Sequence, residues 1–389
     1  RRHGKLPWSE VVAPAIRFAS GGFRVEHHLA HALLGLDDAA DAFARSIFDV
    51  SEVPRQGDIV TRATLGSALG QLAEKGADAL HKGKGAKAIA AASRAQGGIL
   101  TARDLADYTP RDRDPIVGDY RGWTVITMPP PSSGGVVLVQ MLGVLEAHDL
   151  GAMGHNSAAY VHLVSEASKH AFADRARTMG DPDRITVPVD ALTSDARIEA
   201  VRAAFDPERT LASDAYGMPI DAGTDGGTLH LSTLDSDGLA VALTTTINTS
   251  FGSRVVVPEL GIVLNNEMDD FVARPGVPNA YGLVGSEANA VAPGARPLSS
   301  MSPTVLLSPD GKQRIVVGAS GGPFIITSTL QTVLNIIDFG MDPAEAVSVP
   351  RFHHQWQPDK LFLDTGMSVD TAALLEARGH TVQSFDFFS

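Results

Sequence analysis

The chain has 389 residues, 44% of them hydrophobic, with a formal net charge of −13 and no cysteine. This composition is ordinary for a globular protein, and the negative charge argues against a nucleic acid or an anionic membrane surface as the partner. The lack of cysteine excludes disulfides, thiolate nucleophiles and cysteine-ligated zinc, and no apolar run reaches the ~18–20 residues of a membrane helix.

The first half of the chain is predicted to be mainly helical. Apolar residues recur there at helical spacing, and glycines or capping residues stand at the ends of these stretches. One strand, GWTVITM at 122–128, interrupts the helices. The predicted helices cover 8–20 with a break at Pro14, 27–36, 62–82, 84–96, 101–108 with a capping box from Thr101 to Asp104, 136–148, 158–177 and 191–205.

The second half changes from loop to strands and then to helices. Residues 206–227 are rich in Asp, Pro, Gly and Ser and have no apolar period, which predicts an exposed loop. Beyond it, apolar residues alternate on either side of Asp237-Gly238, the pattern of two strands joined by a tight turn. The predicted elements are strands at 229–235, 239–247, 253–257, 261–265, 303–308 and 313–318, and helices at 324–339 and 369–378. This order favours antiparallel sheet covered by helices.

Thr228 is the first residue of the first of these strands, directly after the loop. If the bond between Gly227 and Thr228 were cut, one residue would carry both a hydroxyl nucleophile and a free α-amine with an unperturbed pKa of about 7.7–8. A threonine that uses its own amine as the base is a recognised type of activated nucleophile. The simpler alternative is a strand that begins with a β-branched residue.

Two other patterns bind ligands in other proteins. His27 and His31 stand four residues apart, but no carboxylate or third ligand is set near them. PPPSSGG at 129–135 lacks the Gly-Lys-Ser/Thr of a phosphate loop and is better explained as a rigid bend before the next helix. We therefore predict neither a metal nor a cofactor.

Several motifs follow one another in one order along the chain. They are Thr228-x-His230-x-Ser232, TTTINTSFGS from Thr244, GIVLNNEMDDF from Gly261, PLSSMSPT from Pro297 and GASGGP from Gly318, with DYRGWTVITMPPPSSGG (119–135) and FADRARTMGDPD (172–183) upstream. Together they resemble the γ-glutamyltransferases (γ-glutamyltranspeptidases), which are N-terminal-nucleophile hydrolases. The resemblance covers nearly the whole chain. It implies an α+β fold, the αββα sandwich, in which two stacked and mainly antiparallel sheets are covered by helices.

The resemblance also implies an activity. The expected protein is a self-processing γ-glutamyltransferase and glutathione hydrolase that cleaves γ-glutamyl amides through a γ-glutamyl-Thr228 acyl-enzyme and transfers the acyl group to water, amino acids or peptides. Residues 1–227 would be the large-subunit portion, shortened at its N-terminus, and 228–389 the small-subunit portion, shortened at its C-terminus, in one intertwined structural domain. Its partners would be small γ-glutamyl substrates such as glutathione, without nucleic acid or membrane span, in the periplasm or secreted.

The reaction needs a nucleophile, a base, an oxyanion site and a clamp for the charged end of the substrate. Thr228 would supply the first two, and the backbone N–H groups of Gly321 and Gly322 would stabilise the oxyanion. The resemblance implies the remaining roles: Thr246 hydrogen-bonds the nucleophile, Asn248, Glu267 and Asp270 hold the α-ammonium, Ser299 and Ser300 hold the α-carboxylate, and Tyr281 is the aromatic gate of a lid loop over 275–294. Taken singly, each could also be an ordinary strand or loop residue.

Two alternatives stay open. A related acylase for glutaryl or cephalosporin side chains would share the fold, but a glutaryl group has no ammonium for Glu267 and Asp270 to bind. An unprocessed, inactive member that acts as a binding protein is the other. The family's usual arginine partner for the carboxylate lies upstream of residue 1, and Gly226, Gly227 and Leu229 stand where the family has polar residues and a second threonine.

Overall fold

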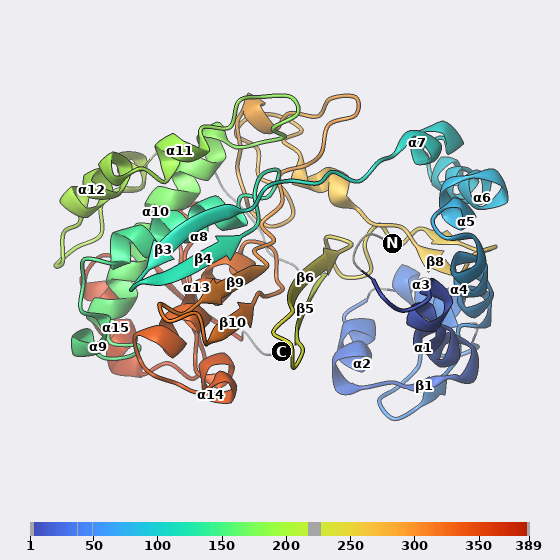
Figure 1. Ribbon diagram of the computed structural model, residues 1–389, viewed down its shortest axis with the longest axis horizontal. Coiled ribbons are helices and arrows are strands. Elements are labelled where there is room, and N and C mark those ends of the chain that lie inside the picture. Colours follow the sequence, from blue (N-terminus) through green and yellow to red (C-terminus); the bar gives the residue numbers. More distant parts are fainter. Residues whose placement is uncertain (1–3, 37, 49, 217–226, 387–389) are drawn as a thin grey trace. The chain divides into compact units, whose positions relative to one another are not determined.

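The computed structural model describes residues 4–36, 38–48, 50–216 and 227–386. The chain forms two compact units, one of residues 1–112 with 250–266 and one of 113–249 with 267–389 (Figure 1). Every candidate site residue belongs to the second unit. Thr228 therefore lies inside the second unit and not at a boundary between the units. Cleavage of the chain before Thr228 stays a prediction.

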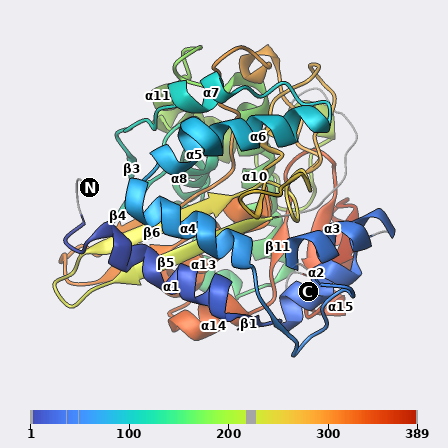
Figure 2. The ribbon, with the colours of Figure 1, turned by 90° about the vertical axis from the view of Figure 1, so that its right-hand side faces the viewer.

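The first unit is mainly helical, and α1 lies along α4 (Figure 2). Its elements are α1 (Trp8–Gly21), β1 (Phe23–Arg24), α2 (His27–Leu34), α3 (Asp38–Phe48), β2 (Ile59–Val60), α4 (Ala63–Lys75), α5 (Asp78–His81), α6 (Gly83–Ala95), α7 (Ala102–Asp107), β7 (Val256–Val257) and β8 (Ile262–Val263). Two apolar clusters hold it together, one around Val25 and Phe48 and one around Ile89 and Val257.

Two helix predictions in this unit need correction. The predicted break at Pro14 is wrong, because α1 continues through it and packs against α4, which offsets the one internal hydrogen bond that a proline removes. The predicted helix 62–82 is two helices, since Gly76 adopts a φ of 64° and ends α4. The capping box is confirmed: the Thr101 hydroxyl accepts from the Asp104 amide, and the Asp104 carboxylate accepts from the Thr101 amide at 2.7 Å.

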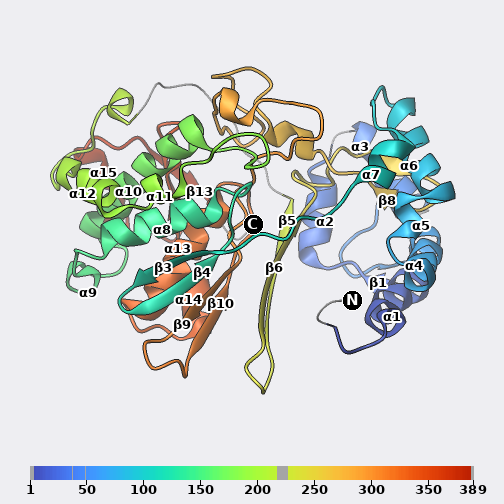
Figure 3. The ribbon, with the colours of Figure 1, turned by 45° about the horizontal axis from the view of Figure 1, so that its top comes forward.

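The second unit is built on a four-stranded antiparallel sheet in the order β10-β9-β4-β3. Helices α8 and α13 pack on this sheet and α10 packs on α8, while the β5–β6 hairpin contacts β9 and β10. Figure 3 shows the hairpin on the side of the sheet away from α8 and α10. The elements are β3 (Ile116–Tyr120), β4 (Trp123–Thr127), α8 (Gly134–Leu145), α9 (Leu150–Met153), α10 (Ala158–Thr178), α11 (Val189–Leu192), α12 (Asp195–Ala204), η1 (Ser213–Ala215), β5 (Thr228–Leu234), β6 (Ala240–Thr246), η2 (Glu267–Asp270), η3 (Glu287–Asn289), β9 (Thr304–Leu307), β10 (Arg314–Val317), α13 (Phe324–Ile337), α14 (Pro343–Ser348), β11 (Phe352–His353), β12 (Leu361–Asp364), α15 (Val369–Ala377) and β13 (Val382–Phe385). The predicted hairpin is confirmed, with Gly238 at a φ of 86° in its turn.

Helix α10 is buried on nearly every side, whereas its sequence predicts one apolar face. The apolar face is present, and polar side chains are also enclosed, because the α10 surface opposite the sheet is covered by 206–216 and by the segment before β13. Lys169 is 1% exposed and donates to the Glu166 carboxylate at 2.9 Å. Thr210 and Tyr216 also donate to Glu166. Glu166 is therefore fully bonded and pairs with an internal cation.

Three histidines complete this buried network. His162 Nδ1 and His380 Nε2 lie 2.7 Å apart, and the other ring nitrogen of His162 contacts the Asp206 carbonyl at 2.8 Å. His354 stacks edge-on near His380. The ligand atoms of His162, Glu166 and His380 are close enough to share a cation, but Lys169 already supplies the positive charge to Glu166. We interpret the cluster as a structural network.

Stability is expected to fall as pH drops below about 6.5. Burial lowers the pKa of His162, His354 and His380 in the folded protein. Between the folded and the unfolded pKa values, the unfolded chain therefore binds more protons than the folded one. The stability that is present above pH 6.5 is thus lost on acidification. Thermal unfolding at pH 7.5, 6.5 and 5.5 measures this loss. His380→Asn should flatten the dependence, whereas the exposed His27→Asn should not. Equal slopes for wild type and His380→Asn would contradict the prediction.

Candidate active site

Thr228 opens β5 and pairs directly with Thr246 at the end of β6. The Thr228 hydroxyl donates to the Thr246 hydroxyl at 3.0 Å, and Thr246 also accepts from the Asn248 amide at 2.8 Å. Asn248 is buried and has a φ of 76°, a left-handed conformation that asparagine tolerates. The hairpin register and this turn therefore orient the candidate nucleophile.

The carbonyl of Gly227, which precedes Thr228, faces the same turn. Its oxygen lies 3.4 Å from both the Thr246 hydroxyl and the Ile247 amide, two donors that polarise a carbonyl. The Gly227 amide donates to the Asn248 carbonyl at 2.7 Å, and a Cβ at Gly227 would lie 2.2 Å from the Thr249 carbonyl oxygen. Glycine is thus required here by backbone approach. Gly226 lies outside the described residues.

Two carboxylates stand beside this turn on η2. Glu267 is hydrogen-bonded to Thr246, and burial raises its pKa. Burial, together with the neighbouring Glu267 charge, also raises the pKa of Asp270 to about 7, against the opposing influence of Arg175. Asn279 donates to Asp270 at 3.3 Å. Two neighbouring carboxylates whose charged forms are disfavoured by burial suit a cationic ligand.

Tyr281 lies over the glycine turn that precedes α13. It is 4% exposed, its hydroxyl donates to the Asn248 carbonyl, and its own carbonyl accepts from Gln355 at 3.0 Å. A Cβ on Gly322 would lie 2.4 Å from the Tyr281 ring. Within the described part of the chain, the amides of Gly321 and Gly322 have no acceptor. Two backbone donors are therefore available beneath the tyrosine.

Ser299 and Ser300 lie just before β9, and Ser300 is buried. The segment that carries them is linked to Asp270 through Arg175, which is 4% exposed, donates to Ser133 at 2.9 Å and interacts electrostatically with Asp270. Ser133 in turn donates to the Ser299 carbonyl. Hydrogen bonds and electrostatic interactions thus link Thr228 through Thr246, Glu267, Asp270, Arg175 and Ser133 to Ser299.

The structure accordingly brings the predicted site residues of the second unit into one connected region; their individual roles stay predictions. Sequence reasoning missed four contributors: Arg175, Ser133, Asn279 and Gln355. Arg175 and Ser133 belong to motifs that carry the resemblance, FADRARTMGDPD and PPPSSGG. Membership of these motifs is the one feature of the sequence that could have indicated a role at the site. The prediction of PPPSSGG as a bend before a helix is confirmed, since α8 begins at Gly134.

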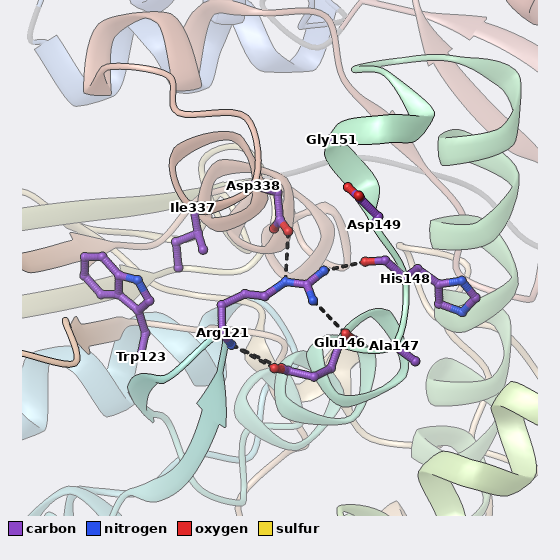
Figure 4. A pocket seen from close by; sticks show the side chains of 9 residues that line it. All are labelled: Arg121, Trp123, Glu146, Ala147, His148, Asp149, Gly151, Ile337 and Asp338. Atoms are coloured by element: carbon purple, nitrogen blue, oxygen red, sulfur yellow. Dashed lines mark hydrogen bonds and ion pairs between the residues drawn. The ribbon is translucent and has the colours of Figure 1, made fainter.

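A separate cavity of about 560 Å³ is lined by Arg121, Trp123, Glu146 and Asp338 among others (Figure 4). None of the predicted site residues lines it. The Arg121 side chain donates to Asp338 at 3.1 Å and to the Glu146 and His148 carbonyls, while its amide donates to the Glu146 carboxylate. Arg121 and Asp338 are thus paired with each other, and Glu146 accepts from a backbone amide.

Comparison with known proteins places the chain among relatives of the same family. The sequence profile of the Gamma-glutamyltranspeptidase family matches residues 1–389. The chain is 45% identical over 386 residues to the glutathione hydrolase proenzyme of Escherichia coli (strain K12), covering 98% of this chain and 66% of that protein. It is 41% identical over 385 residues to the glutathione hydrolase proenzyme of Pseudomonas sp. (strain A14), covering 97% and 66%. The chain thus spans just under two-thirds of the length of these relatives.

Among solved structures, the cephalosporin acylase of Bacillus halodurans superposes with a TM-score of 0.84 at 29% identity, covering 98% of this chain and 68% of that one. The fold is that of the N-terminal-nucleophile hydrolases, of the α+β class, as the sequence predicts. The chain belongs to the γ-glutamyltranspeptidase family. No helix among the described residues is long and apolar enough to cross a membrane.

Proposed function

We propose that the protein containing this chain is a self-processing γ-glutamyltransferase and glutathione hydrolase. One observation carries the proposal: the hydroxyl of Thr228 is hydrogen-bonded to Thr246, which contacts both the Gly227 carbonyl and Glu267, one member of the acidic pair that suits an ammonium. A nucleophile, the bond it must cut to gain its amine, and a cation site therefore meet at one side chain. The curated relatives are named glutathione hydrolase proenzymes, which supports this substrate class.

Processing would proceed within the β5–β6 hairpin. The Thr228 hydroxyl attacks the Gly227 carbonyl, whose oxygen is polarised by Thr246 and Ile247, and the peptide C–N bond breaks to give an ester and a free α-amine. Water then hydrolyses the ester, which leaves a carboxylate on Gly227 and restores the hydroxyl. The products are two chains from one precursor, 228 onward carrying the nucleophile.

Catalysis would then reuse the same hydroxyl. The Thr228 amine accepts the proton of the Thr228 hydroxyl as the hydroxyl oxygen attacks the γ-carbonyl of the substrate. The backbone amides of Gly321 and Gly322 stabilise the resulting oxyanion. The leaving amine takes the proton, and water or an acceptor amine releases the γ-glutamyl group from the ester. Asp270 and Glu267 would bind the α-ammonium, with Asn248 beside them, and Ser299 and Ser300 the α-carboxylate. Tyr281 would close the site against water.

The alternative reaction is that of an acylase, which the structural neighbour's name suggests. Hydrolysis of γ-glutamyl-p-nitroanilide is compared with that of glutaryl-p-nitroanilide, which lacks only the α-amine. We expect the γ-glutamyl compound to be preferred by about 10²-fold or more, since a buried carboxylate left without its cationic partner costs about 3–5 kcal/mol. Equal rates, or preference for the glutaryl compound, would favour the acylase. The compartment, periplasmic or secreted, is proposed from the family resemblance alone.

A further inference from the structure

Residues 129–135, which lead into α8 at Gly134, pack against the segment that carries the predicted carboxylate clamp. Ser132 and Ser133 are both 0% exposed. The amide and the hydroxyl of Ser133 each donate to the Ser299 carbonyl at 2.8 Å, and the Ser299 amide donates to the Pro131 carbonyl at 2.9 Å. Ser132 donates its hydroxyl to the Met301 carbonyl at 2.6 Å. The backbone around Ser299 and Ser300 is thus held on both sides of the clamp.

A buried cation orders the central hydroxyl of this contact. Arg175 Nε donates to the Ser133 oxygen at 2.9 Å, and the same oxygen donates its own hydrogen to Ser299. Burial lowers the pKa of Arg175 to about 10, against the opposing influence of Asp270, so the side chain is charged at neutral pH. The charge polarises the Ser133 hydroxyl toward the Ser299 carbonyl, which strengthens the second hydrogen bond.

The loop has little freedom to shift. A Cβ at Gly134 would lie 2.5 Å from the Met301 carbonyl oxygen, and one at Gly135 would lie 2.1 Å from the Met128 carbonyl oxygen. The first residue of α8 therefore touches the Met301 backbone next to the serine contact, and the second touches the backbone just after β4. A shift of Ser133 would therefore also shift the backbone of Ser299 and Ser300.

We propose that Ser133 is a positioning residue for recognition of the substrate α-carboxylate: it holds the Ser299–Ser300 backbone so that both hydroxyls face that group. This inference rests on the proposed γ-glutamyl function. Ser133 precedes the predicted cut and Ser299 follows it. In a processed protein the large chain would therefore shape the carboxylate clamp of the small chain, although no atom of Ser133 touches the substrate.

The test compares two donors in the full precursor protein, γ-glutamyl-p-nitroanilide and 4-aminobutanoyl-p-nitroanilide, which lacks only the α-carboxylate. For Ser133→Ala we expect KM for the γ-glutamyl donor to rise about tenfold with kcat little changed, because a misplaced clamp weakens a charged hydrogen bond. The efficiency kcat/KM for the 4-aminobutanoyl donor should equal that of the wild type. Ser133→Thr, which keeps the hydroxyl, should restore most of the loss.

Ser168→Ala is the matched control, since Ser168 is equally buried and donates to Met141 away from the clamp; it should affect neither donor. Intact mass and thermal unfolding confirm that each variant is processed and folded. Equal losses for both donors, no loss for either, or no rescue by threonine would overturn the positioning role. Failure of the wild type to hydrolyse γ-glutamyl-p-nitroanilide would instead overturn the proposed function.

Discussion

Thr228→Ala is expected to leave the chain in one piece and to abolish hydrolysis of γ-glutamyl-p-nitroanilide. Without the hydroxyl bonded to Thr246, nothing attacks the Gly227 carbonyl, so neither the cut nor the acyl-enzyme can form. Loss of a hydrolase nucleophile lowers kcat by about 10⁴-fold or more. Intact mass spectrometry measures processing, and the wild type should yield a new chain that begins at Thr228.

Two variants control this experiment. Thr228→Ser keeps the hydroxyl and should still be processed, more slowly. Thr233→Ala changes an exposed threonine of the same strand and should be processed like the wild type. Cleavage of Thr228→Ala at the same bond, or an uncut wild type after prolonged incubation, would contradict the assignment of the nucleophile. The second outcome would also favour the unprocessed, inactive alternative.

Asp270→Asn is expected to raise KM for γ-glutamyl-p-nitroanilide by about 30-fold or more, since removing one partner of a buried charged contact costs about 2–5 kcal/mol. Stability should not suffer, because burial and the Glu267 charge raise the pKa of Asp270 and so disfavour its charged form. Steady-state kinetics and thermal unfolding separate these effects. Asp269→Asn, which changes the adjacent acid, is the matched control and should leave KM within a few-fold of the wild type.

The raised pKa of Asp270 predicts that KM depends on pH. With a pKa of about 7 in the free protein, Asp270 becomes neutral as pH falls and can no longer pair with the ammonium, so KM should rise on the acid side of pH 7. The rise should vanish in Asp270→Asn, whose side chain does not titrate. An unchanged acid limb in the variant would assign the titration to another group.

Much of the fold and of the site could be predicted from residue order. The hairpin with its Asp237-Gly238 turn, the capped helix after Thr101 and the long helix after Ser157 follow from local periodicity and capping, which depend on near neighbours. The predictions fail where distant contacts override local preference. Helix α1 crosses Pro14 because α4 lies beside it, and the short strand β12 (Leu361–Asp364) forms because β11 and β13 pair with it.

The candidate nucleophile, the acidic pair and the family can each be predicted from the sequence, because each is carried by a short motif and the order of these motifs along the chain is visible. The contacts that connect these motifs depend on tertiary packing. The Arg175 side chain on α10 contacts Leu298, 123 residues away, and the Ser133 side chain contacts Ser299, 166 residues away. Such pairings have no local signature. Periodicity indicates which face of an element is buried, whereas a carboxylate clamp held by a buried cation depends on which elements pack together.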